Sequence, residues 1–374
     1  MKPINRRKFV GAAGTAIAAS ILAPGIAAEA PSNTVNVGLI GLGSRGTTHL
    51  KTLLGLPGVR VRAVCDLLPD RVAKAQQAVT DAGQAKPLGA ASWKQLLELK
   101  ELDAVASALP VDVHLACYLD ALAAGKDLYA EKPMCLTLAE CDALIAAAKK
   151  TDRKVQIGFQ RRADPRFIEP MKLVHAGELG TLLEGRINWS ISWGPLYDWF
   201  GKRERSGDWM VEQAVHNWDI MNWANRCRPK RAMGLGLNRF FKDKQADRNV
   251  HDYYAGVLEY ENGVIVNIIH SWLAPKRFDK EYTWLIGSLG GVDFNTGMFS
   301  FRPDLNKEDR PAFEFDGSQI DSTKLAFEAF LKSVRTRSPS IAPPEIGREA
   351  VLTCLLMREA VYRQRPVTLN ELSA

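Results

Sequence analysis

Three glycines with the spacing Gly41-x-Gly43-x-x-Gly46 lie between an apolar run and a stretch of helical character. In a strand–turn–helix unit, such glycines allow a tight turn, a close approach of the backbone to a pyrophosphate, and close packing of the helix on the strand. The helix N-terminus would also offer free N–H groups and the positive end of its dipole to phosphates. The spacing predicts a dinucleotide site that includes Ser44 and Arg45; the alternative is a plain glycine-rich turn.

A carboxylate stands where the second strand of such a unit should end. Residues 59–64 have the pattern of a strand, and Asp66 follows Gly46 by twenty positions. An acidic side chain at this distance can bond the ribose 2′-hydroxyl of the adenosine half, and it repels a 2′-phosphate. Leu67 offers such a phosphate no cation, although Arg71 lies one turn further on. The pattern therefore favours NAD over NADP without excluding NADP.

A lysine follows the strand expected at residues 128–130, in the tripeptide Glu131-Lys132-Pro133. Ligands of open α/β sheets bind outside the carboxyl ends of the strands, so Lys132 would lie beside the nicotinamide. There it could exchange a proton with a substrate hydroxyl. The alternative is that Glu131 and Lys132 are ordinary surface residues of a loop.

A second group of titratable residues is Glu212, His216 and Asp219. If residues 209–224 form one helix, these side chains share a face at i, i+4 and i+7. A histidine held by carboxylates can act as a general acid or base near neutral pH. A purely structural pair is the alternative. No further paired histidines accompany the group, so we expect no metal site.

The elements that must position these residues alternate in type over the first half of the chain. Strand-like runs lie at residues 35–40, 59–64, 104–109, 128–130 and 155–159. Helical stretches between them include residues 47–54, 92–100, 114–124 and 137–149. Such alternation predicts a parallel sheet covered by helices on both faces.

Beyond Gly180 the period changes to two. Residues 183–193 alternate apolar and polar side chains, as in a strand with one dry and one wet face. Residues 253–260 and 264–272 flank an Asn-Gly turn, and residues 282–286 and 292–295 suggest a second hairpin. We expect a mainly antiparallel sheet, with closing helices at residues 322–334 and 345–363.

The composition is that of an ordinary globular protein long enough for two domains. The 374 residues are 46% hydrophobic and 24% charged, with a formal net charge of +7. No basic block with interleaved aromatics appears, so we expect no nucleic-acid partner. The six cysteines show no CxxC spacing, and we expect most of them to be buried as small hydrophobic residues.

The first thirty residues resemble a cleavable export signal and are set apart from the fold. Arg6 and Arg7 form a twin-arginine pattern, a weakly apolar run follows, and Ala28 to Ala30 provides small residues for cleavage. Bacterial signals of this kind export proteins that are already folded, which suits an enzyme that must first load a cofactor. We expect a periplasmic protein without stable membrane insertion. A basic tail or a retained anchor is the alternative.

At this point the chain resembles the Gfo/Idh/MocA oxidoreductase family over essentially all of its mature length. The matching pieces, in the family's order, are Gly41-Leu42-Gly43-Ser44-Arg45-Gly46, Ala124-Gly125-Lys126 with Glu131-Lys132-Pro133, Gly158-Phe159-Gln160-Arg161-Arg162, and His216-Asn217-Trp218-Asp219. The resemblance implies an α/β class with a second α+β part. An N-terminal Rossmann parallel sheet (31–158) would precede an open-faced, mainly antiparallel β-sheet domain (159–374), whose C-terminal helices can pack back on the Rossmann domain.

The resemblance also implies roles for single residues. Lys132 and His216 would be the acid/base pair of a sugar or polyol oxidoreductase, joined by Glu212, which stands where family dehydrogenases usually carry an aspartate. The expected NAD contacts are Gly41, Gly43, Ser44, Arg45, Gly46, Asp66, Pro110, His114, Glu131 and Lys132. The expected substrate contacts are Gln160, Arg161, Arg162, Trp193 and Asp219, where tryptophan faces would favour the C–H surfaces of a sugar.

Three functions remain open on this basis. The first is an oxidoreductase that holds NAD tightly and acts on a sugar or related polyol. The second is a redox-neutral glycoside hydrolase, in which a sugar carbon is oxidised, the aglycone is eliminated and the ketone is reduced again. The third is a non-catalytic relative that binds a sugar. For each, the family resemblance implies a homo-oligomer, because relatives use the open sheet face for dimer or tetramer contacts.

Overall fold

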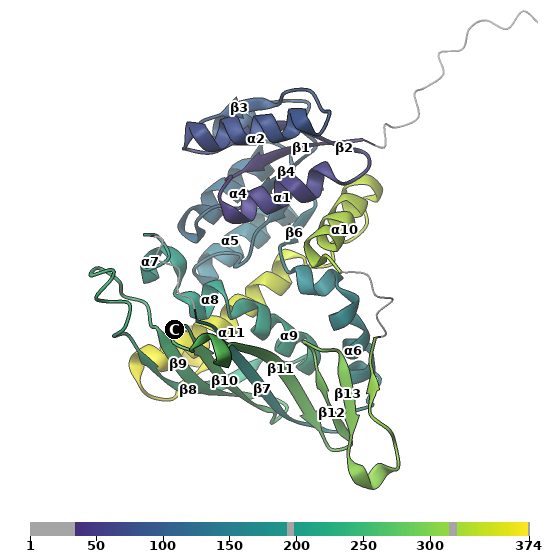
Figure 1. Cartoon of the computed structure of the whole chain (residues 1–374), viewed down its shortest axis with the longest axis vertical. Coiled ribbons are helices and arrows are strands. Elements are labelled where there is room, and N and C mark those ends of the chain that lie inside the picture. The colour runs from purple at the N-terminus through teal and green to yellow at the C-terminus, as the bar shows by residue number, and fades with distance from the viewer. Residues whose placement is uncertain (1–33, 193–197, 314–319, 373–374) are drawn as a thin grey trace, which may run out of the picture. The chain divides into compact units, whose positions relative to one another are not determined.

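The computed structural model describes residues 34–192, 198–313 and 320–372. Within these ranges the first sheet has six parallel strands. In spatial order they are β3 (Leu88–Ala90), β2 (Val59–Cys65), β1 (Val35–Ile40), β4 (Ala104–Ser107), β5 (Asp127–Ala130) and β6 (Val155–Ile157). The helices that follow these strands are α1 (Ser44–Leu54), α2 (Pro69–Asp81), α3 (Trp93–Leu97), α4 (His114–Ala123) and α5 (Leu138–Lys149). The predicted Rossmann architecture is therefore confirmed (Figure 1).

Local chemistry explains most of these elements, and also two differences from the prediction. Thr137 caps α5, because its hydroxyl accepts the N–H of Glu140 while the Glu140 carboxylate accepts the N–H of Thr137. The helix expected at 92–100 is shorter, because α3 ends at Leu97. Neither α2 nor β3 was predicted: β3 spans only three residues, whereas α2 carries a helical apolar period that the prediction overlooked.

The second sheet has nine strands within the described residues. Their spatial order is β14 (Arg310–Pro311), β13 (Met298–Phe301), β12 (Gly290–Asp293), β11 (Lys280–Gly287), β7 (Leu182–Ser190), β10 (Ile265–Ser271), β9 (Tyr253–Tyr260), β8 (Pro229–Leu237) and β15 (Val367–Thr368). Both predicted hairpins form, as β9–β10 and β11–β12. The sheet is mixed, because β7 and β10 pair in parallel while the other strands pair antiparallel. The strand expected to reach residue 193 ends at Ser190.

The remaining helices are α6 (Pro165–His175), α7 (Arg203–Ser206), α8 (Trp209–Glu212), α9 (Val215–Asn225), α10 (Ser322–Thr336) and α11 (Pro344–Arg363). The late helix α10 packs on α1 and adds Phe327 and Phe330 to the core beneath β1 and β2. Tyr129 of β5 stacks on Phe327 with ring centroids 4.2 Å apart. Sequence-distant α10 thus completes the Rossmann core (Figure 1).

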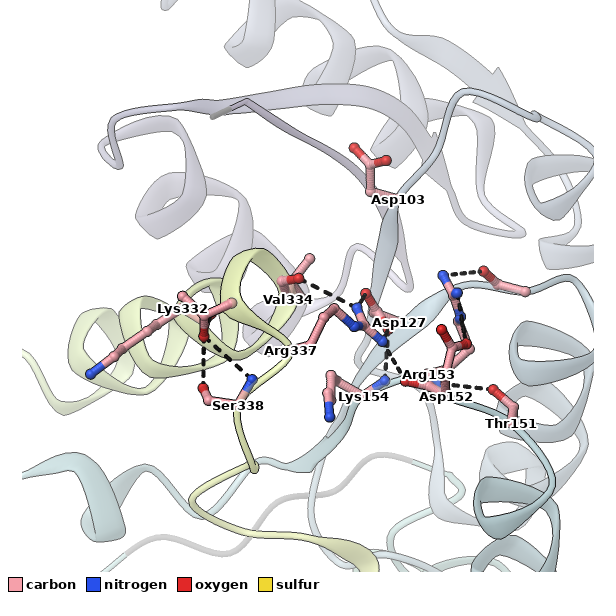
Figure 2. A network of polar contacts seen from close by, with 12 residues as sticks. Asp103, Asp127, Thr151, Asp152, Arg153, Lys154, Lys332, Val334, Arg337 and Ser338 are labelled. Atoms are coloured by element: carbon pink, nitrogen blue, oxygen red, sulfur yellow. Dashed lines mark hydrogen bonds and ion pairs between the residues drawn. The ribbon is translucent and has the colours of Figure 1, made fainter. Parts of the chain in front are cut away.

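A polar clamp fixes the end of α10 to the first sheet (Figure 2). Arg337 caps this helix in the left-handed conformation, with φ at 58°. Its guanidinium bonds both carboxylate oxygens of the buried Asp127, at 2.7 and 3.1 Å. It also donates to the main-chain carbonyl of Asp152, while Asp127 accepts the N–H of Lys154 at 2.6 Å. The clamp joins α10 to the starts of β5 and β6.

One face of the second sheet is apolar and exposed. The strand register places Met233 opposite Val257, and it aligns Leu235, Ala255 and Ile269 across three strands. Met233 and Leu235 remain 56% and 63% exposed. Scattered exposed apolar residues are normal, but a contiguous set on a sheet face marks a candidate interaction surface.

Candidate functional site

The three glycines of the motif meet different surroundings. A Cβ on Gly41, whose φ is +85°, would lie 2.3 Å from the carbonyl oxygen of Ala108, and one on Gly46 would lie 1.8 Å from that of Gly41. A Cβ on Gly43 would meet only the Arg71 guanidinium, at 3.8 Å. Gly41 and Gly46 are therefore required by packing. Gly43 instead keeps the backbone open where a phosphate would approach.

Helix α1 begins at Ser44 without a side-chain cap, because Gly43 occupies the cap position. Its first N–H groups therefore have no side-chain cap, as an anion site at a helix N-terminus requires. The adjacent Asp66 carboxylate accepts the N–H groups of Leu42 at 2.8 Å and Leu68 at 3.0 Å. Arg71 approaches Asp66 at 3.5 Å. Asp66 is thus oriented at the end of β2, where the ribose was expected.

The side chains of Arg45 and Glu131, both predicted as cofactor contacts, bond each other. Glu131 is buried and accepts Arg45 Nε at 2.7 Å, and His49 Nε2 lies 2.9 Å from the same oxygen. Its second oxygen accepts the main-chain N–H of Lys132 at 3.0 Å. Burial opposes ionisation of Glu131, but Arg45 and His49 outweigh it and hold the pKa of this carboxyl well below its usual range. Glu131 therefore fixes the backbone of Lys132 from inside.

Arg45 also reaches the start of α10, where its Nη1 donates to the hydroxyl of Thr323 at 3.1 Å. His49 and Thr323 were not among the predicted site residues. His49 lies four residues after Arg45 on one helix face, so helical spacing could have found it. No local signal links Thr323 to a residue 278 positions away.

Pro110 and His114 lie in the connection that follows β4. Pro110 precedes a single helical turn, and the His114 ring lies between the carbonyl oxygens of Leu109 and Pro133, both at 2.9 Å. Burial lowers the pKa of His114. His114 therefore ties the loop after β4 to the loop that carries Lys132, and its ring nitrogens are directed at protein.

The Lys132 ammonium group is held by Glu212. Its Nζ donates to the main-chain oxygen of Glu212 at 2.6 Å and to Oε1 at 2.7 Å. The two side chains are 14% and 16% exposed, so the pair is largely shielded yet reachable. The structure thus brings together Lys132 and Glu212, two of the three predicted catalytic residues, by direct contact.

The expected single helix at 209–224 is wrong. It breaks after Glu212 into α8 and α9, so Glu212, His216 and Asp219 do not share the face of one continuous helix. Glu212 bonds Lys132, and Asp219 bonds Arg162. No partner for the buried Nδ1 of His216 occurs among the described residues. The predicted contacts of two carboxylates with this histidine are therefore absent from the described structure.

His216 is nevertheless neutral, which a proton acceptor requires, although the same pKa shift weakens its basicity. Burial, with the charges of Lys132 and Arg161, lowers its pKa well below the usual range. The ring therefore stays neutral near pH 7, and one nitrogen can accept a proton. Its ring also lies 6.1 Å from that of Phe159, at the end of β6.

Arg162 and Asp219, both predicted to contact substrate, form a buried pair with each other. Arg162 Nε and Nη2 bond the Asp219 carboxylate at 2.8 to 3.0 Å, and the guanidinium lies 4.7 Å from the Trp223 ring centre. Burial raises the pKa of Asp219. These contacts join α9 to the turn after β6. Trp193 lies outside the described residues.

Gln160 and Arg161 both line one pocket of the described structure. Trp209 and Trp218 are fully buried and belong to the core, so they offer no face to a substrate. Five of the six cysteines are buried, as predicted. Burial raises the pKa of Cys65 to about 11 and that of Cys117 to about 12.

The described ranges contain no group of three or more His, Cys, Asp or Glu placed to hold a metal ion. No helix in these ranges combines the length and the apolar composition needed to cross a bilayer. The N-terminal segment with the twin-arginine pattern lies outside the described residues, as does the rest of 1–33.

An open glycine cradle at a helix N-terminus, an oriented carboxylate after β2 and a shielded lysine after β5 define a dinucleotide-dependent oxidoreductase class. Comparison of the sequence with known protein families supports this class. Residues 35–159 match the oxidoreductase family with an NAD-binding Rossmann fold, and residues 168–293 match the GFO/IDH/MocA C-terminal domain. The chain belongs to the GFO/IDH/MocA oxidoreductase family and carries its NAD-binding domain.

Individual relatives span several activities. The chain is 28% identical to Glycosyl hydrolase family 109 protein 1 of Phocaeicola vulgatus over 86% of this chain and 68% of that protein. It is 30% identical to Inositol 2-dehydrogenase 2 of Saccharopolyspora erythraea, over 70% of this chain and 74% of that one. The aldose-aldose oxidoreductase of Caulobacter crescentus has a similar structure, with a TM-score of 0.77, 19% identity, and coverage of 90% and 99%.

Proposed function

We propose that this protein oxidises or reduces a hydroxyl-bearing carbon of a sugar or related polyol, with NAD held tightly at the glycine cradle. The observation that carries the proposal is the Lys132–Glu212 pair at the carboxyl end of β5. The inositol dehydrogenase and aldose oxidoreductase names of relatives support a polyol substrate. When bound, NAD would supply hydride transfer at its nicotinamide ring.

The chain's own residues would manage the proton. Two of the three Lys132 N–H groups are engaged by Glu212, which leaves one to bond a substrate oxygen. His216 is neutral near pH 7, so it can take the hydroxyl proton when a carbinol is oxidised. Lys132 would polarise the same oxygen. Glu131, bonded to Arg45 and to the Lys132 backbone, would keep this loop in place.

The test is an exchange experiment with the NAD-loaded protein. C-deuterated sugars and cyclitols are incubated with it, and transfer of deuterium to the bound cofactor is measured by mass spectrometry. We expect transfer from at least one substrate, with loss of transfer in His216→Ala at unchanged secondary structure. Full transfer in that variant would remove the proposed proton path.

Tight cofactor binding has its own measurement. Acid-denatured, exhaustively dialysed protein should release about one NAD or NADH per chain. An empty site would mean that the cofactor exchanges freely, and it would leave a simple dehydrogenase or a non-catalytic relative. It would also weaken the proposal of export with a loaded cofactor.

A second candidate is redox-neutral glycoside hydrolysis. Two observations favour it: the relative named as a glycosyl hydrolase, and a His216 that is not bonded to Glu212. A histidine free of that carboxylate could serve an elimination step at the neighbouring carbon. Release of an aglycone without net NADH would support this candidate, whereas an accumulating ketosugar would support the oxidoreductase.

We also propose export to the periplasm through the twin-arginine pattern, and self-association through the exposed sheet face of Met233, Leu235, Val257 and Ile269. Burying such a face removes apolar area from water at about 25 cal/mol per Å². Light scattering should show a dimer or tetramer that Leu235→Glu dissociates. In cells that express the Arg6→Lys/Arg7→Lys variant, fractionation should find the protein in the cytoplasm.

A further inference from the structure

Asp208 holds a backbone conformation that is unusual for any residue other than glycine. Its φ is +70° and its ψ is 155°, in a region that is essentially restricted to glycine. The other non-glycine residues with positive φ in the described ranges end helical segments in the ordinary left-handed conformation: Arg226, Asn306, Arg337 and Gln364. Strain of the Asp208 kind persists only where the surroundings enforce it, and it collects at functional sites.

The surroundings hold Asp208 through its side chain, which is fully buried. Its Oδ2 accepts the hydroxyl of Tyr362 on α11 at 2.6 Å and the main-chain N–H of His251 at 3.1 Å. The other oxygen accepts the N–H of Met210 at 3.1 Å and so caps α8. Asp208 is therefore fixed by three parts of the chain, namely α11, the segment before β9 and α8 itself.

The residue before Asp208 lies against the loop that carries Lys132. A Cβ on Gly207, whose φ is +79°, would lie 3.2 Å from Cδ2 of Leu136, four residues after Lys132. The carbonyl oxygen of Gly207 accepts the Arg358 guanidinium, also from α11, at 3.2 Å. Helix α11 therefore holds both Gly207 and Asp208 in place beside this loop.

The main chain of Asp208 leads directly to the candidate catalytic pair. Its carbonyl oxygen accepts the N–H of Glu212 at 2.9 Å, which closes the single turn of α8. The main-chain and carboxylate oxygens of Glu212 accept Lys132 Nζ at 2.6 and 2.7 Å. A continuous series of hydrogen bonds thus runs from Tyr362 through Asp208 and Glu212 to Lys132. Because α8 is about one turn long, a shift at its start also moves its end.

We propose that Asp208 is a positioning residue for Lys132. Its enforced backbone conformation and its bond to Tyr362 set where Glu212 presents two oxygens to the lysine ammonium group. The direction of the remaining N–H of Lys132 depends on where those two acceptors lie. A group oriented in this way before the substrate arrives reaches the reacting geometry at a lower barrier. This inference adds a positioning residue to the proposed function and rests on it.

The test compares two variants with the wild type, all loaded with NAD. Tyr362→Phe removes one hydroxyl and keeps the ring. Asp208→Gly removes the carboxylate from a conformation that glycine adopts without strain, so we expect both variants to fold. Tyr260→Phe is the matched control, because its buried hydroxyl donates to Asn222 of α9 at 2.7 Å and not to a residue of α8.

The first measurement is the rate at which acetic anhydride acetylates Lys132, followed by peptide mass spectrometry, and it requires no turnover. Lys126 is the internal reference for general loosening, because it is buried and donates to the carbonyl oxygens of Leu99 and Leu102. Acetylation of Lys132 should rise about threefold or more in both variants, with Lys126 unchanged, since a local opening exposes only the groups that it releases. Unchanged acetylation of Lys132 in either variant would overturn the inference, as would an equal rise at Lys126 or in Tyr260→Phe.

The second measurement is the single-turnover rate of deuterium exchange. Tyr362→Phe should lower this rate about tenfold and Asp208→Gly about 10²-fold, at unchanged affinity for NAD, since small misplacements of a reacting group have effects of that size. In a Lys132→Met background neither change should lower the rate further, because both act through Lys132. Equal losses in the two backgrounds would indicate a merely structural role and overturn the inference.

The positioning role and the proposed function fail differently. If no probe transfers deuterium, the proposed function fails, while acetylation of Lys132 still decides whether Asp208 positions it. Exchange that both variants leave unchanged, at unchanged acetylation of Lys132, would sustain the oxidoreductase function and overturn the positioning role.

Discussion

Lys132 donates two hydrogen bonds to Glu212, one to its carboxylate at 2.7 Å and one to its main-chain oxygen at 2.6 Å. The two residues are 80 positions apart and come from the loop after β5 and the last residue of α8. The main-chain bond depends on where α8 ends. The break between α8 and α9 is therefore part of how the lysine is positioned.

The first prediction concerns this pair. Lys132→Met should lower the rate of deuterium exchange by about 10²- to 10⁴-fold, because proton transfer by a positioned group contributes on that scale. Glu212→Asp should cost less, since the main-chain bond to Nζ persists. Rates come from single-turnover mass spectrometry, with circular dichroism as the control for folding. An unchanged rate in Lys132→Met would refute the assignment of this lysine.

The second prediction separates two glycines of one motif. Gly46→Ala should prevent folding or strongly lower the melting temperature, because its Cβ would lie 1.8 Å from the Gly41 oxygen. Gly43→Ala should melt near the wild type yet bind NAD more weakly, because its Cβ enters open space. Calorimetric NAD titration and thermal melting provide the comparison. If Gly43→Ala bound NAD like the wild type, the phosphate approach would lie elsewhere.

The third prediction concerns the choice between NAD and NADP. Asp66→Asn removes a negative charge at the expected ribose position but keeps an oxygen for the N–H groups of Leu42 or Leu68. The ratio of NADP to NAD affinity should rise about tenfold or more, since like charges repel a 2′-phosphate. Asp70→Asn, one turn further on, is the matched control. A ratio that moves equally in both variants would exclude a specific role for Asp66.

The fourth prediction is an acid-sensitive stability. Desolvation lowers the pKa of four buried histidines below 6.5, namely His49, His114, His216 and His270. The unfolded chain binds protons at these rings below about pH 6.5 and the folded chain does not, so the free energy of unfolding should fall as pH drops. A second decline should begin below about pH 4.5, where unfolded Glu131 protonates but the folded carboxylate stays charged.

Urea denaturation at pH 7.5, 6.0 and 5.0 measures this effect. His270→Asn should reduce the slope by up to about 1.4 kcal/mol per pH unit, the contribution of one titrating group. His270 suits the comparison because burial alone lowers its pKa. A stability that is flat between pH 7.5 and 5.0 would show that these rings do not remain neutral in the folded protein.

The fifth prediction concerns the clamp at the end of α10. Arg337→Met leaves the buried Asp127 without its ionic partner, and it should lower the free energy of unfolding by about 1–3 kcal/mol. We expect a smaller loss of stability than for a fully buried ion pair, because the Arg337 side chain is 39% exposed. Arg186→Met, which breaks an exposed pair with Glu184, should cost under about 1 kcal/mol. Equal losses in urea denaturation would deny the clamp a special role.

The sequence by itself was sufficient for the features that depend on neighbours in the chain. The glycine-rich turn, most of the apolar strands and the Asn-Gly hairpin were predicted correctly, because turn geometry and side-chain period are local properties. The Rossmann sheet followed from the alternation of strands and helices. Lys132 was placed at the end of β5 for the same reason.

Only the tertiary structure decided which side chains meet. Helical spacing alone assigned Glu212 and Asp219 to His216, yet the helix breaks and each carboxylate bonds a cation from the first half of the chain instead. Arg45 likewise meets Thr323 across 278 positions. Charged groups that leave water gain most from a well-placed opposite charge, and folding can bring that charge from any part of the chain. Sequence spacing therefore identified the titratable residues of the site, while contacts between distant parts of the chain determined which residues they bond.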